Sequence, residues 1–436
     1  MRVSVILLAL RAVLGMTKGA RRVAGRVTRC LAGTAALIVL VLGPGSTAPL
    51  GPDRPATDTT SLSQHPARLL VPTAATTAAG RHSSRRAGSD LPAATAGPVS
   101  RSAAGPDEHH LPTATVTGPD GMPWQVLAGW SDPVQWPRRG TVVSATVTGA
   151  RTRLTEQAWV HLPGAYFATT GSGPLGGARE LPVTVVFTGY PGHEDNLITR
   201  QHYPQVAADA VTAGTLTPTV LVMLSPSVDH PWDTECTDIP HGPQAFTFDA
   251  EDVPDAVAAR FGLHPDAYAA IGDSTGGYCA AKLESLDPGR FTAAASLSGY
   301  YRPATDPSTR GVFTDTGLRE RNDLGWRLLH LPVPPVALLL ATARDETGAD
   351  GWATDREWFD LTRAPMTTDQ LTLDHGGHNS AAWAREIPYA LSWIADHLPH
   401  APTTTAPVPA GATLTHHTDV DRRSAPPATR HTTGHR

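Results

Sequence analysis

A serine among glycines is the first candidate for chemistry in this sequence. Residues 270–283 read AIGDSTGGYCAAKL, and residues 272–276 fit the pattern G-x-S-x-G centred on Ser274. In this pattern the serine sits on a sharp turn between a strand and a helix, where side chains two positions to either side would collide. The pattern therefore predicts that Ser274 is a nucleophile, provided that a strand precedes it and a helix follows.

Two kinds of serine site compete for this stretch. With Thr275 set aside, it reads G-D-S-G-G, the motif of chymotrypsin-like peptidases, whose serine lies on a loop between antiparallel strands. The flanking sequence favours the strand-turn-helix alternative. DAYAAIG, ending at Gly272, is a short apolar run, and residues 277–286 are strong helix formers that stop before Pro288.

The segments around the turn alternate between strand and helix signals. Buried-strand runs at 181–189 and 219–226 flank a helical run at 203–214, and a second helical run follows at 249–263. Three more strand-like runs, TAAASLSGY, PPVALLLATA and DQLTLDH, come after the turn, and GTVVSATVTG and EQAWVHLPG lead in. The pattern predicts an α/β fold: a mostly parallel central sheet flanked by helices, with an antiparallel lead-in hairpin.

A nucleophile of this kind needs a carboxylate and then a histidine on later strands. PPVALLLATARDETGAD ends a strand and brings Asp345 or Glu346 to where a carboxylate would hold an imidazole. LTLDHGGHNSAAW ends the next strand and offers His375 and His378. The two glycines before His378 favour it as the base, because they would let it reach back over Ser274. The residues alone leave the choice of acid open.

Four motifs together resemble the putative-esterase family of α/β-hydrolases. They are VVFTGYPG, GDSTGGYCA, SLSGYY and GGHNSAAW, and the resemblance covers roughly residues 140–398. The family includes S-formylglutathione hydrolases, feruloyl-type esterases and the mycolyltransferases of mycobacterial cell walls. The resemblance implies the α/β-hydrolase fold and an activity that cleaves esters or transfers their acyl groups.

The resemblance also implies roles for individual residues. The family's histidine lies in a G-G-H-x-x-x-x-W pattern, which selects His378, with Trp383 completing the pattern. The family's acid follows the penultimate strand, which makes Asp345 the first choice. Mycolyltransferases use a glutamate there, and this keeps Glu346 as the second choice.

Two backbone N–H groups are expected to hold the oxyanion that forms during acyl transfer. The N–H of Thr275 opens the helix after the nucleophile, where the helix dipole favours negative charge. By the resemblance, the second donor follows a glycine in the first long loop. In the motif FTGYPG this donor is the N–H of Tyr190.

Composition divides the chain into four segments. From 46 to about 111, and again from 400 to 436, the chain is mostly Ala, Thr, Ser, Pro, Gly and Arg. Such segments hold too few large apolar residues to offset the entropy lost on ordering. We expect a disordered linker at 46–111, one α/β-hydrolase (esterase) domain at 112–399 and a disordered tail at 400–436. Residues 1–45 form the fourth segment.

Residues 1–45 have the order of an export signal. A cluster of four arginines at 21–29 precedes the apolar run LAGTAALIVLVLG at 31–43, and small residues follow the run. The run is short for a spanning helix, so the segment is either a signal peptide or a membrane anchor. We therefore expect the catalytic domain to lie outside the cell membrane, either extracellular or anchored, with membrane or cell-wall association as one outcome.

Charge and histidine placement bear on partners and cofactors. The formal net charge is -5, and no long basic run lies in the foldable part, which argues against nucleic acid as a partner. His109, His110 and the histidines of the C-terminal tail have ligand chemistry but no folded scaffold to impose a geometry. We expect no metal site and no cofactor.

Two cysteines lie in the foldable part, Cys236 in DTECTDIPHGP and Cys279 shortly after the nucleophile. In an exported chain such a pair favours a disulfide. The alternative is that Cys279 is a small buried apolar residue and Cys236 a loop thiol. A bridge would fix the loop around Cys236 beside Ser274.

These inferences combine into one predicted function. The chain is expected to be a secreted or membrane-tethered serine esterase or acyltransferase that forms an acyl-enzyme, with Ser274 attacking, His378 moving the proton and Asp345 orienting His378. The expected substrate is a small-molecule ester or an ester of a lipid or sugar. The alternative is a non-catalytic cell-envelope binding protein on the same fold.

Overall fold

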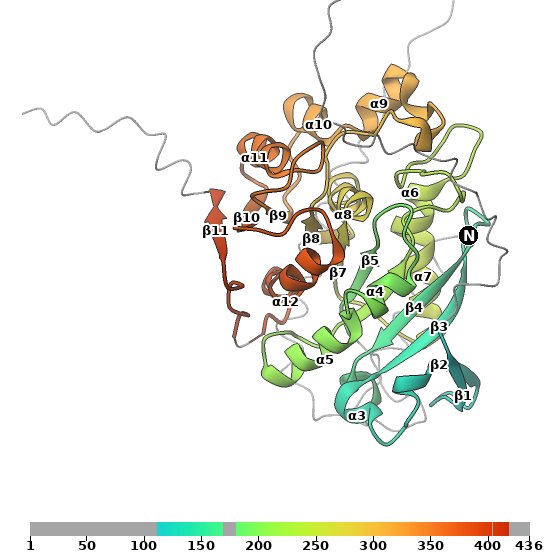
Figure 1. Ribbon diagram of the computed structural model, residues 1–436. Coiled ribbons are helices and arrows are strands. Elements are labelled where there is room, and N and C mark those ends of the chain that lie inside the picture. The colour runs from blue at the N-terminus through green and yellow to red at the C-terminus, as the bar shows by residue number, and fades with distance from the viewer. Residues whose placement is uncertain (1–110, 169–179, 403, 418–436) are drawn as a thin grey trace, which may run out of the picture. The chain divides into compact units, whose positions relative to one another are not determined.

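The structure, a computed structural model, describes residues 111–168, 180–402 and 404–417 (Figure 1). The expected signal peptide or anchor at 1–45 lies outside the described residues, as does all but the last residue of the expected linker. Among the described residues, no helix has the length and apolar character needed to cross a membrane.

The described strands join one mixed sheet in the order β1-β2-β3-β4-β6-β5-β7-β8-β9-β10-β11. From β6 to β10 in this order the strands run parallel, whereas β1 to β4 and β11 pair antiparallel. This arrangement confirms the predicted fold class. The bounds are Thr113–Thr117 (β1), Pro123–Leu127 (β2), Thr141–Thr148 (β3), Thr155–Leu162 (β4), Val183–Phe187 (β5), Val220–Leu224 (β6), Tyr268–Asp273 (β7), Phe291–Leu297 (β8), Ala337–Ala343 (β9), Thr367–Leu373 (β10) and Ala412–His416 (β11).

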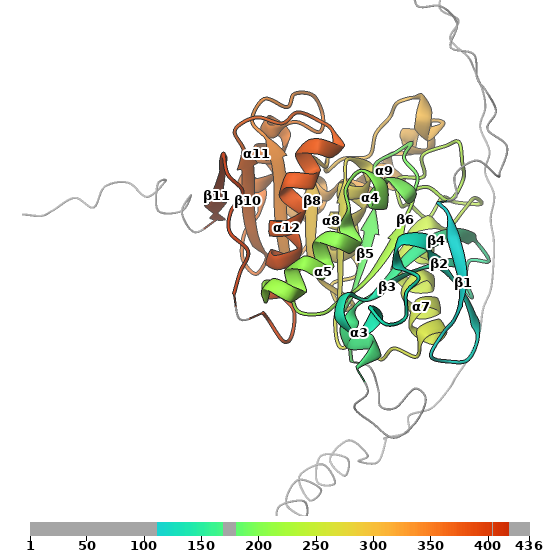
Figure 2. The ribbon, with the colours of Figure 1, turned by 60° about the horizontal axis from the view of Figure 1, so that its bottom comes forward.

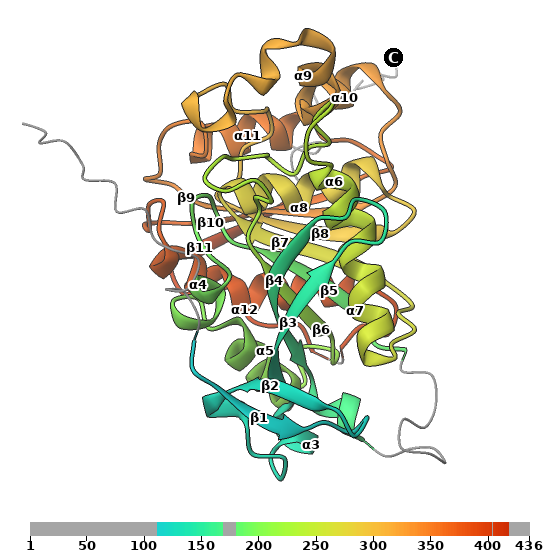
Figure 3. The same ribbon diagram turned by 90° about the vertical axis from the view of Figure 1, so that its right-hand side faces the viewer.

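Helices cover both faces of this sheet. Figure 2 shows α5 and α12 in front of the strands, where the two helices also contact each other, and Figure 3 shows α8 on the opposite face. The bounds are Trp136–Arg139 (α3), Asp195–Thr199 (α4), Tyr203–Ala213 (α5), Ala245–Thr247 (α6), Val253–Phe261 (α7), Thr275–Leu286 (α8), Thr316–Asn322 (α9), Leu324–His330 (α10), Trp352–Leu361 (α11) and Ser380–Asp396 (α12).

The two strands β5 and β6 are almost entirely apolar because helices cover the sheet on both sides. β5 reads VTVVF and β6 reads VLVML, and every residue in both is buried. Strands of this kind carry continuous apolar runs instead of an alternating pattern. This explains why their positions are readable from the sequence.

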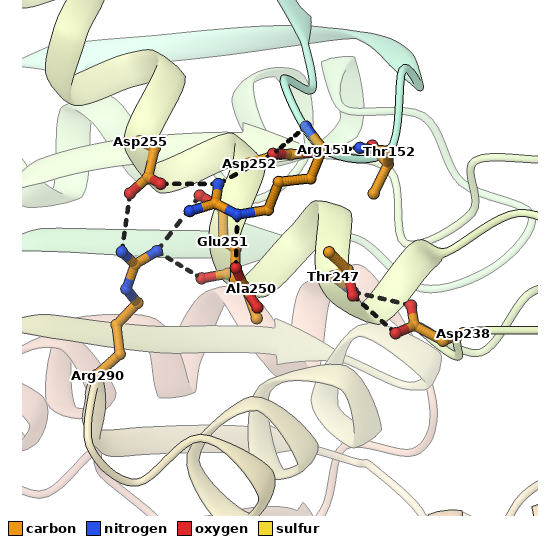
Figure 4. A network of polar contacts seen from close by, with 9 residues as sticks. All are labelled: Arg151, Thr152, Asp238, Thr247, Ala250, Glu251, Asp252, Asp255 and Arg290. Carbon is orange, nitrogen blue, oxygen red and sulfur yellow. Dashed lines mark hydrogen bonds and ion pairs between the residues drawn. The ribbon is translucent and has the colours of Figure 1, made fainter.

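The lead-in hairpin of β3 and β4 is tied to the main body at its turn (Figure 4). The buried carboxylate of Asp252 accepts hydrogen bonds from the backbone N–H groups of Arg151, at 3.0 Å, and Thr152, at 2.9 Å. The Arg151 guanidinium pairs with Glu251 at 2.7 Å and Asp255 at 2.9 Å. These contacts hold the turn against the start of α7. The outer hairpin of β1 and β2 was not predicted.

The expectation of a disordered tail from residue 400 is wrong for residues 412–416. There β11 pairs antiparallel with β10 over five residue pairs, from Ala412 opposite Leu373 to His416 opposite Asp369. The chain leading to β11 is anchored as well, since Arg385 of α12 donates to the carbonyl of Ala410. The composition of the tail does not predict this strand, because only five residues form it. The strand forms because it pairs with β10, which the composition of the tail does not reveal. Residues after 417 lie outside the described residues.

The parallel strands place their carboxyl ends along one edge of the sheet. β5 ends at Phe187, β7 at Asp273, β9 at Ala343 and β10 at Leu373. Ligand and catalytic groups of open α/β sheets gather outside this edge. The loops that follow these four strands carry all of the residues that the sequence proposes for catalysis.

Candidate active site

Ser274 lies at the turn between β7 and α8 in a strained backbone conformation, with φ 54° and ψ -122°. Such a conformation persists only where the surrounding structure enforces it. A side chain at residue 272 would lie 2.5 Å from the backbone of Gly276, and one at 276 would lie 2.5 Å from the carbonyl oxygen of Phe187. The glycines on both sides are therefore required for the turn to close, as the motif predicts.

The loop after β5 lies directly against this turn. A side chain at Gly189 would lie 2.9 Å from Cβ of Ser274. The N–H of Gly189 donates to the buried carboxyl of Asp273 at 3.0 Å, and the side-chain amide of Gln201 donates to the same carboxyl at 2.8 Å. Burial raises the pKa of Asp273 to about 6. Asp273 thus fixes the loop that carries Tyr190 beside Ser274.

The expected oxyanion donors both border the same cleft as Ser274. Tyr190 and Thr275 line it together with the serine. Thr275 is the first residue of α8, a position whose N–H has no acceptor within its own helix. The structure therefore brings the residues of the two expected donors and Ser274 to one cleft.

His378 pairs with Glu346. Its Nδ1 lies 2.7 Å from Oε1 of the buried Glu346 carboxyl. The other carboxyl oxygen accepts hydrogen bonds from Ser298, at 2.8 Å, and from Thr342, at 3.2 Å. Both oxygens are thus occupied, and this fixes the direction in which the carboxyl faces His378.

Trp383 completes the surroundings of the imidazole. Its ring meets the His378 ring edge to face, with centroids 5.0 Å apart, and its Nε1–H donates to Ser298 at 2.9 Å. His378 directly precedes Asn379, whose side chain caps the start of α12. The histidine of the G-G-H-x-x-x-x-W pattern is therefore held by packing as well as by its acid.

Asp345, the first choice for the acid, lies elsewhere. Its carboxylate accepts hydrogen bonds from the N–H groups of Gly376, at 2.9 Å, and Gly377, at 3.2 Å. Its nearest imidazole is that of the exposed His375, at 3.5 Å. The hydrogen bond from Gly376 is the main reason why its pKa is lowered. The structure thus pairs Glu346, the second choice, with His378.

The cleft has a volume of about 570 Å³. Besides Ser274, its lining includes Asp350, whose Oδ2 lies 3.6 Å from Nε2 of His378. A smaller pocket of about 200 Å³ adjoins it through shared residues, among them Tyr300, and is otherwise lined in part by Trp358 and Leu361. Ser274 therefore faces a polar cleft with a more apolar pocket beside it.

The loop after β6 forms one wall of the cleft and is held by a disulfide. Cys236 is bonded to Cys279 of α8, with Cα atoms 5.7 Å apart. Two carboxyls of this loop line the cleft. Asp233 accepts a hydrogen bond from the Thr275 hydroxyl at 3.3 Å, and Glu235 accepts one from Tyr300 at 2.7 Å. The disulfide thus joins the cleft wall to α8, the helix that follows Ser274.

A buried lysine lies beneath this wall. The ammonium of Lys282 donates to the carbonyl of Glu235 at 2.9 Å and to the hydroxyl of Thr237 at 2.6 Å. Burial lowers the pKa of Lys282 to about 7 and raises those of Glu235, to about 8, and Asp233, to about 6. Sequence reasoning missed this cluster, because nothing in the spacing of these residues relates Lys282 to the loop.

Metal ligands do not cluster in the part of the chain that the structure describes, where no group of three or more His, Cys, Asp or Glu residues could hold an ion.

Ser298, which donates a hydrogen bond to Glu346, is a further residue of the site that sequence reasoning missed. Its signal lay in the motif SLSGYY, directly after a strand of the parallel sheet.

Comparisons with known proteins bear on the family and the fold of this chain. Residues 157–395, more than half of the chain, match the family described as "Putative esterase". The MPT51 antigen of Mycobacterium leprae is 46% identical over 59 residues, which are 14% of this chain and 20% of that protein. The MPT51/MPB51 antigen of Mycobacterium tuberculosis H37Rv is 43% identical over 66 residues, 15% of this chain and 22% of that protein.

Among solved structures, an S-formylglutathione hydrolase from Agrobacterium tumefaciens superposes with a TM-score of 0.50 at 14% identity. The superposition covers 60% of this chain and 96% of the hydrolase chain. At this identity the likeness concerns the fold alone. This chain matches only about a fifth of the length of the two antigens. The match over residues 157–395 carries the assignment: the chain belongs to the putative-esterase family.

Proposed function

We propose that this chain is a serine esterase or acyltransferase that works through an acyl-enzyme on Ser274. The observation that carries the proposal is the Glu346–His378 pair, 2.7 Å apart, at the sheet edge where Ser274 opens into the cleft. A carboxylate bound at Nδ1 leaves Nε2 of the imidazole to take up a proton. For this reason Glu346 takes the place of Asp345 in the proposed triad.

The first half of the reaction forms the acyl-enzyme. Oγ of Ser274 attacks the ester carbonyl carbon while Nε2 of His378 takes the hydroxyl proton. The carbonyl electron pair moves to oxygen, where the N–H groups of Thr275 and Tyr190 stabilise it. When the intermediate collapses, the bond to the leaving alkoxide breaks and Nε2–H returns the proton to that oxygen.

The second half differs only in its acceptor. Water attacking the acyl-enzyme gives hydrolysis, and an alcohol held in the cleft gives acyl transfer. In both cases Nε2 of His378 takes the proton of the attacking hydroxyl, and when the bond between the acyl carbon and Oγ of Ser274 breaks it returns a proton to Oγ. The substrate that we propose is a small-molecule ester or an ester of a lipid or sugar. The cleft of about 570 Å³ next to Ser274 would hold the alcohol portion or the acceptor.

We propose that the catalytic domain acts outside the cell membrane, either secreted or anchored. The basic and apolar segments within residues 1–45 support export. The Cys236–Cys279 disulfide supports it as well, since such bonds persist in oxidising compartments.

The proposal predicts that a fluorophosphonate probe labels the wild-type protein at Ser274 and leaves Ser274→Ala unlabelled. Mass spectrometry of the labelled peptide identifies the residue. A panel of p-nitrophenyl esters of increasing acyl length, run with and without sugar acceptors, then separates hydrolysis from transfer.

The second candidate function is a cell-envelope binding protein that keeps the fold without the chemistry. It predicts a folded wild-type protein that neither reacts with the probe nor turns over any ester of the panel. The enforced backbone conformation of Ser274 favours the enzyme, because strain of this kind is retained where a mechanism uses it.

The disulfide carries a prediction of its own. Breaking it with Cys236→Ser should lower the melting temperature of the exported protein by several degrees. The chain-entropy model assigns roughly 4 kcal/mol to a closed loop of this length, whose ends are 43 residues apart. Because the loop carries Asp233 and Glu235 in the cleft wall, KM should rise more than kcat falls.

Thermal unfolding and steady-state kinetics check both parts of this expectation. The matched control is Cys236→Ser combined with Cys279→Ser, which should melt close to the single variant because only one bond is lost. Free thiols at both positions in protein exported under oxidising conditions, found by non-reducing peptide mapping, would contradict the prediction.

A further inference from the structure

His378 lies between two carboxyl groups. Glu346 meets its Nδ1 at 2.7 Å, and Asp350 meets its Nε2 at 3.6 Å. The proposed triad gives Nδ1 an acid but leaves Nε2 for the hydroxyl of Ser274 and for the leaving group. The carboxylate of Asp350 therefore faces the nitrogen that carries the moving proton, and the triad assigns it no role.

One short loop positions both carboxyls. It runs from the end of β9 to the start of α11, and it turns back on itself where the N–H of Gly351 donates to the carbonyl of Gly348 at 3.2 Å. The N–H of Trp352 donates to the carbonyl of Glu346 at 3.3 Å, which closes the loop. Asp350 is thus held on the cleft side of the imidazole and lines the cleft together with Ser274.

A carboxylate at this place interacts differently with the neutral and the protonated form of the imidazole. In the proposed mechanism the resting imidazole is neutral and Nε2 carries a lone pair, and a nearby negative charge disfavours that form relative to the protonated one. Once Nε2 has taken the serine proton, the ring is a cation and the same charge attracts it. The charge is about one-third exposed, so solvent reduces this attraction without removing it.

We propose that Asp350 stabilises the protonated form of His378 during acyl transfer. Asp350 would thus be a second carboxylate, beside Glu346, that acts on the reaction by way of the His378 imidazole. The proposal rests on the proposed function of Ser274 and His378. An interaction that strengthens as the ring gains its proton lowers the barrier, because it favours the transition state over the resting enzyme.

The charges around the imidazole predict the direction of the pH effect. Burial lowers the pKa of His378, but the Glu346 hydrogen bond and the charges of Glu346, Asp350 and Asp273 outweigh it, and the pKa is raised. Burial raises the pKa of Asp350, while His378 opposes this shift. Activity requires the neutral imidazole, so a raised pKa moves the acid limb of the pH profile to higher pH.

The test is Asp350→Asn, which removes the charge and keeps the size of the side chain. We expect kcat for p-nitrophenyl acetate to fall about tenfold at the pH plateau, and the acid limb to move to lower pH. A residue with a merely structural role would not move that limb. Asp350→Glu, which restores the charge, should return the limb towards its wild-type position.

Asp306→Asn is the matched control. This carboxyl lines the same cleft, but its side chain accepts hydrogen bonds from Ser308 within its own turn, which asparagine can also accept. The control removes the same charge from the cleft and should leave the acid limb in place. Equal shifts in the two variants, or a plateau kcat in Asp350→Asn that is unchanged or higher, would overturn the proposal.

A second measurement does not depend on turnover. In the Ser274→Ala background, the ¹H–¹⁵N signals of the His378 ring are followed by NMR as the pH is varied. The pKa of the ring should fall on adding Asp350→Asn, and an unchanged pKa overturns the proposal. If the wild-type protein turns over no ester, the proposed function fails instead, and the ring titration still decides whether Asp350 stabilises the protonated imidazole.

Discussion

Replacing Ser274 with alanine is expected to reduce ester turnover by about a millionfold, and His378→Ala should cost about as much. Ser274 supplies the atom that attacks, and His378 supplies the nitrogen that takes its proton, so neither can act without the other. The double variant should therefore be hardly slower than either single one. Single-turnover and steady-state kinetics with p-nitrophenyl acetate measure all three.

The control for this pair is His375→Ala. His375 is exposed and lies 3.5 Å from Asp345, whereas His378 is bound to the buried Glu346. Activity in His375→Ala should stay close to that of the wild type. Loss of activity there, together with normal turnover in His378→Ala, would identify the other histidine as the base.

The sequence predicts those parts of the fold that local patterns determine. β5 and β6 are continuous apolar runs because both of their faces are covered, and the predicted runs at 181–189 and 219–226 contain them. The predicted helix at 203–214 contains α5, which ends at Ala213 and is followed by Gly214 in the left-handed conformation. Each of these patterns is local, because the residues that form it belong to the predicted element or adjoin it in the chain.

The parts that the sequence did not predict depend on distant partners. β11 is five residues long in a tail of low apolar content, and it forms because β10 offers an open edge. The sequence predicts the Cys236–Cys279 bond that holds the wall of the cleft. It does not predict the hydrogen bond that Glu235 of this wall accepts from Tyr300, 65 residues away in the chain. No periodicity in the sequence encodes such contacts.

The sequence also could not predict which residue is the acid of the proposed triad. Asp345 and Glu346 are adjacent, so spacing alone cannot tell which of them faces the imidazole. The direction of the loop after β9 decides it, because the N–H of Trp352 returns to the carbonyl of Glu346. Ser298 and Thr342 then bind the second oxygen of Glu346, whereas Asp345 turns outward.

Glu346→Gln is accordingly expected to lower kcat by about four orders of magnitude. The uncharged amide no longer stabilises the imidazolium, and its NH₂ can donate to Nδ1 of His378. The ring proton then moves to Nε2, which can no longer accept the proton of Ser274. KM should change little, because Glu346 is buried behind the imidazole and does not line the cleft.

Asp345→Asn is the matched change at the neighbouring position, and we expect it to alter kcat by about threefold or less, as is usual for exposed charges. Its side-chain carbonyl can still accept the hydrogen bonds that Gly376 and Gly377 donate to Asp345, so the loop before His378 keeps its anchor. Parallel measurement of kcat, KM and melting temperature separates loss of chemistry from loss of stability. A large loss of kcat in Asp345→Asn with near-normal turnover in Glu346→Gln would return the role of the acid to Asp345.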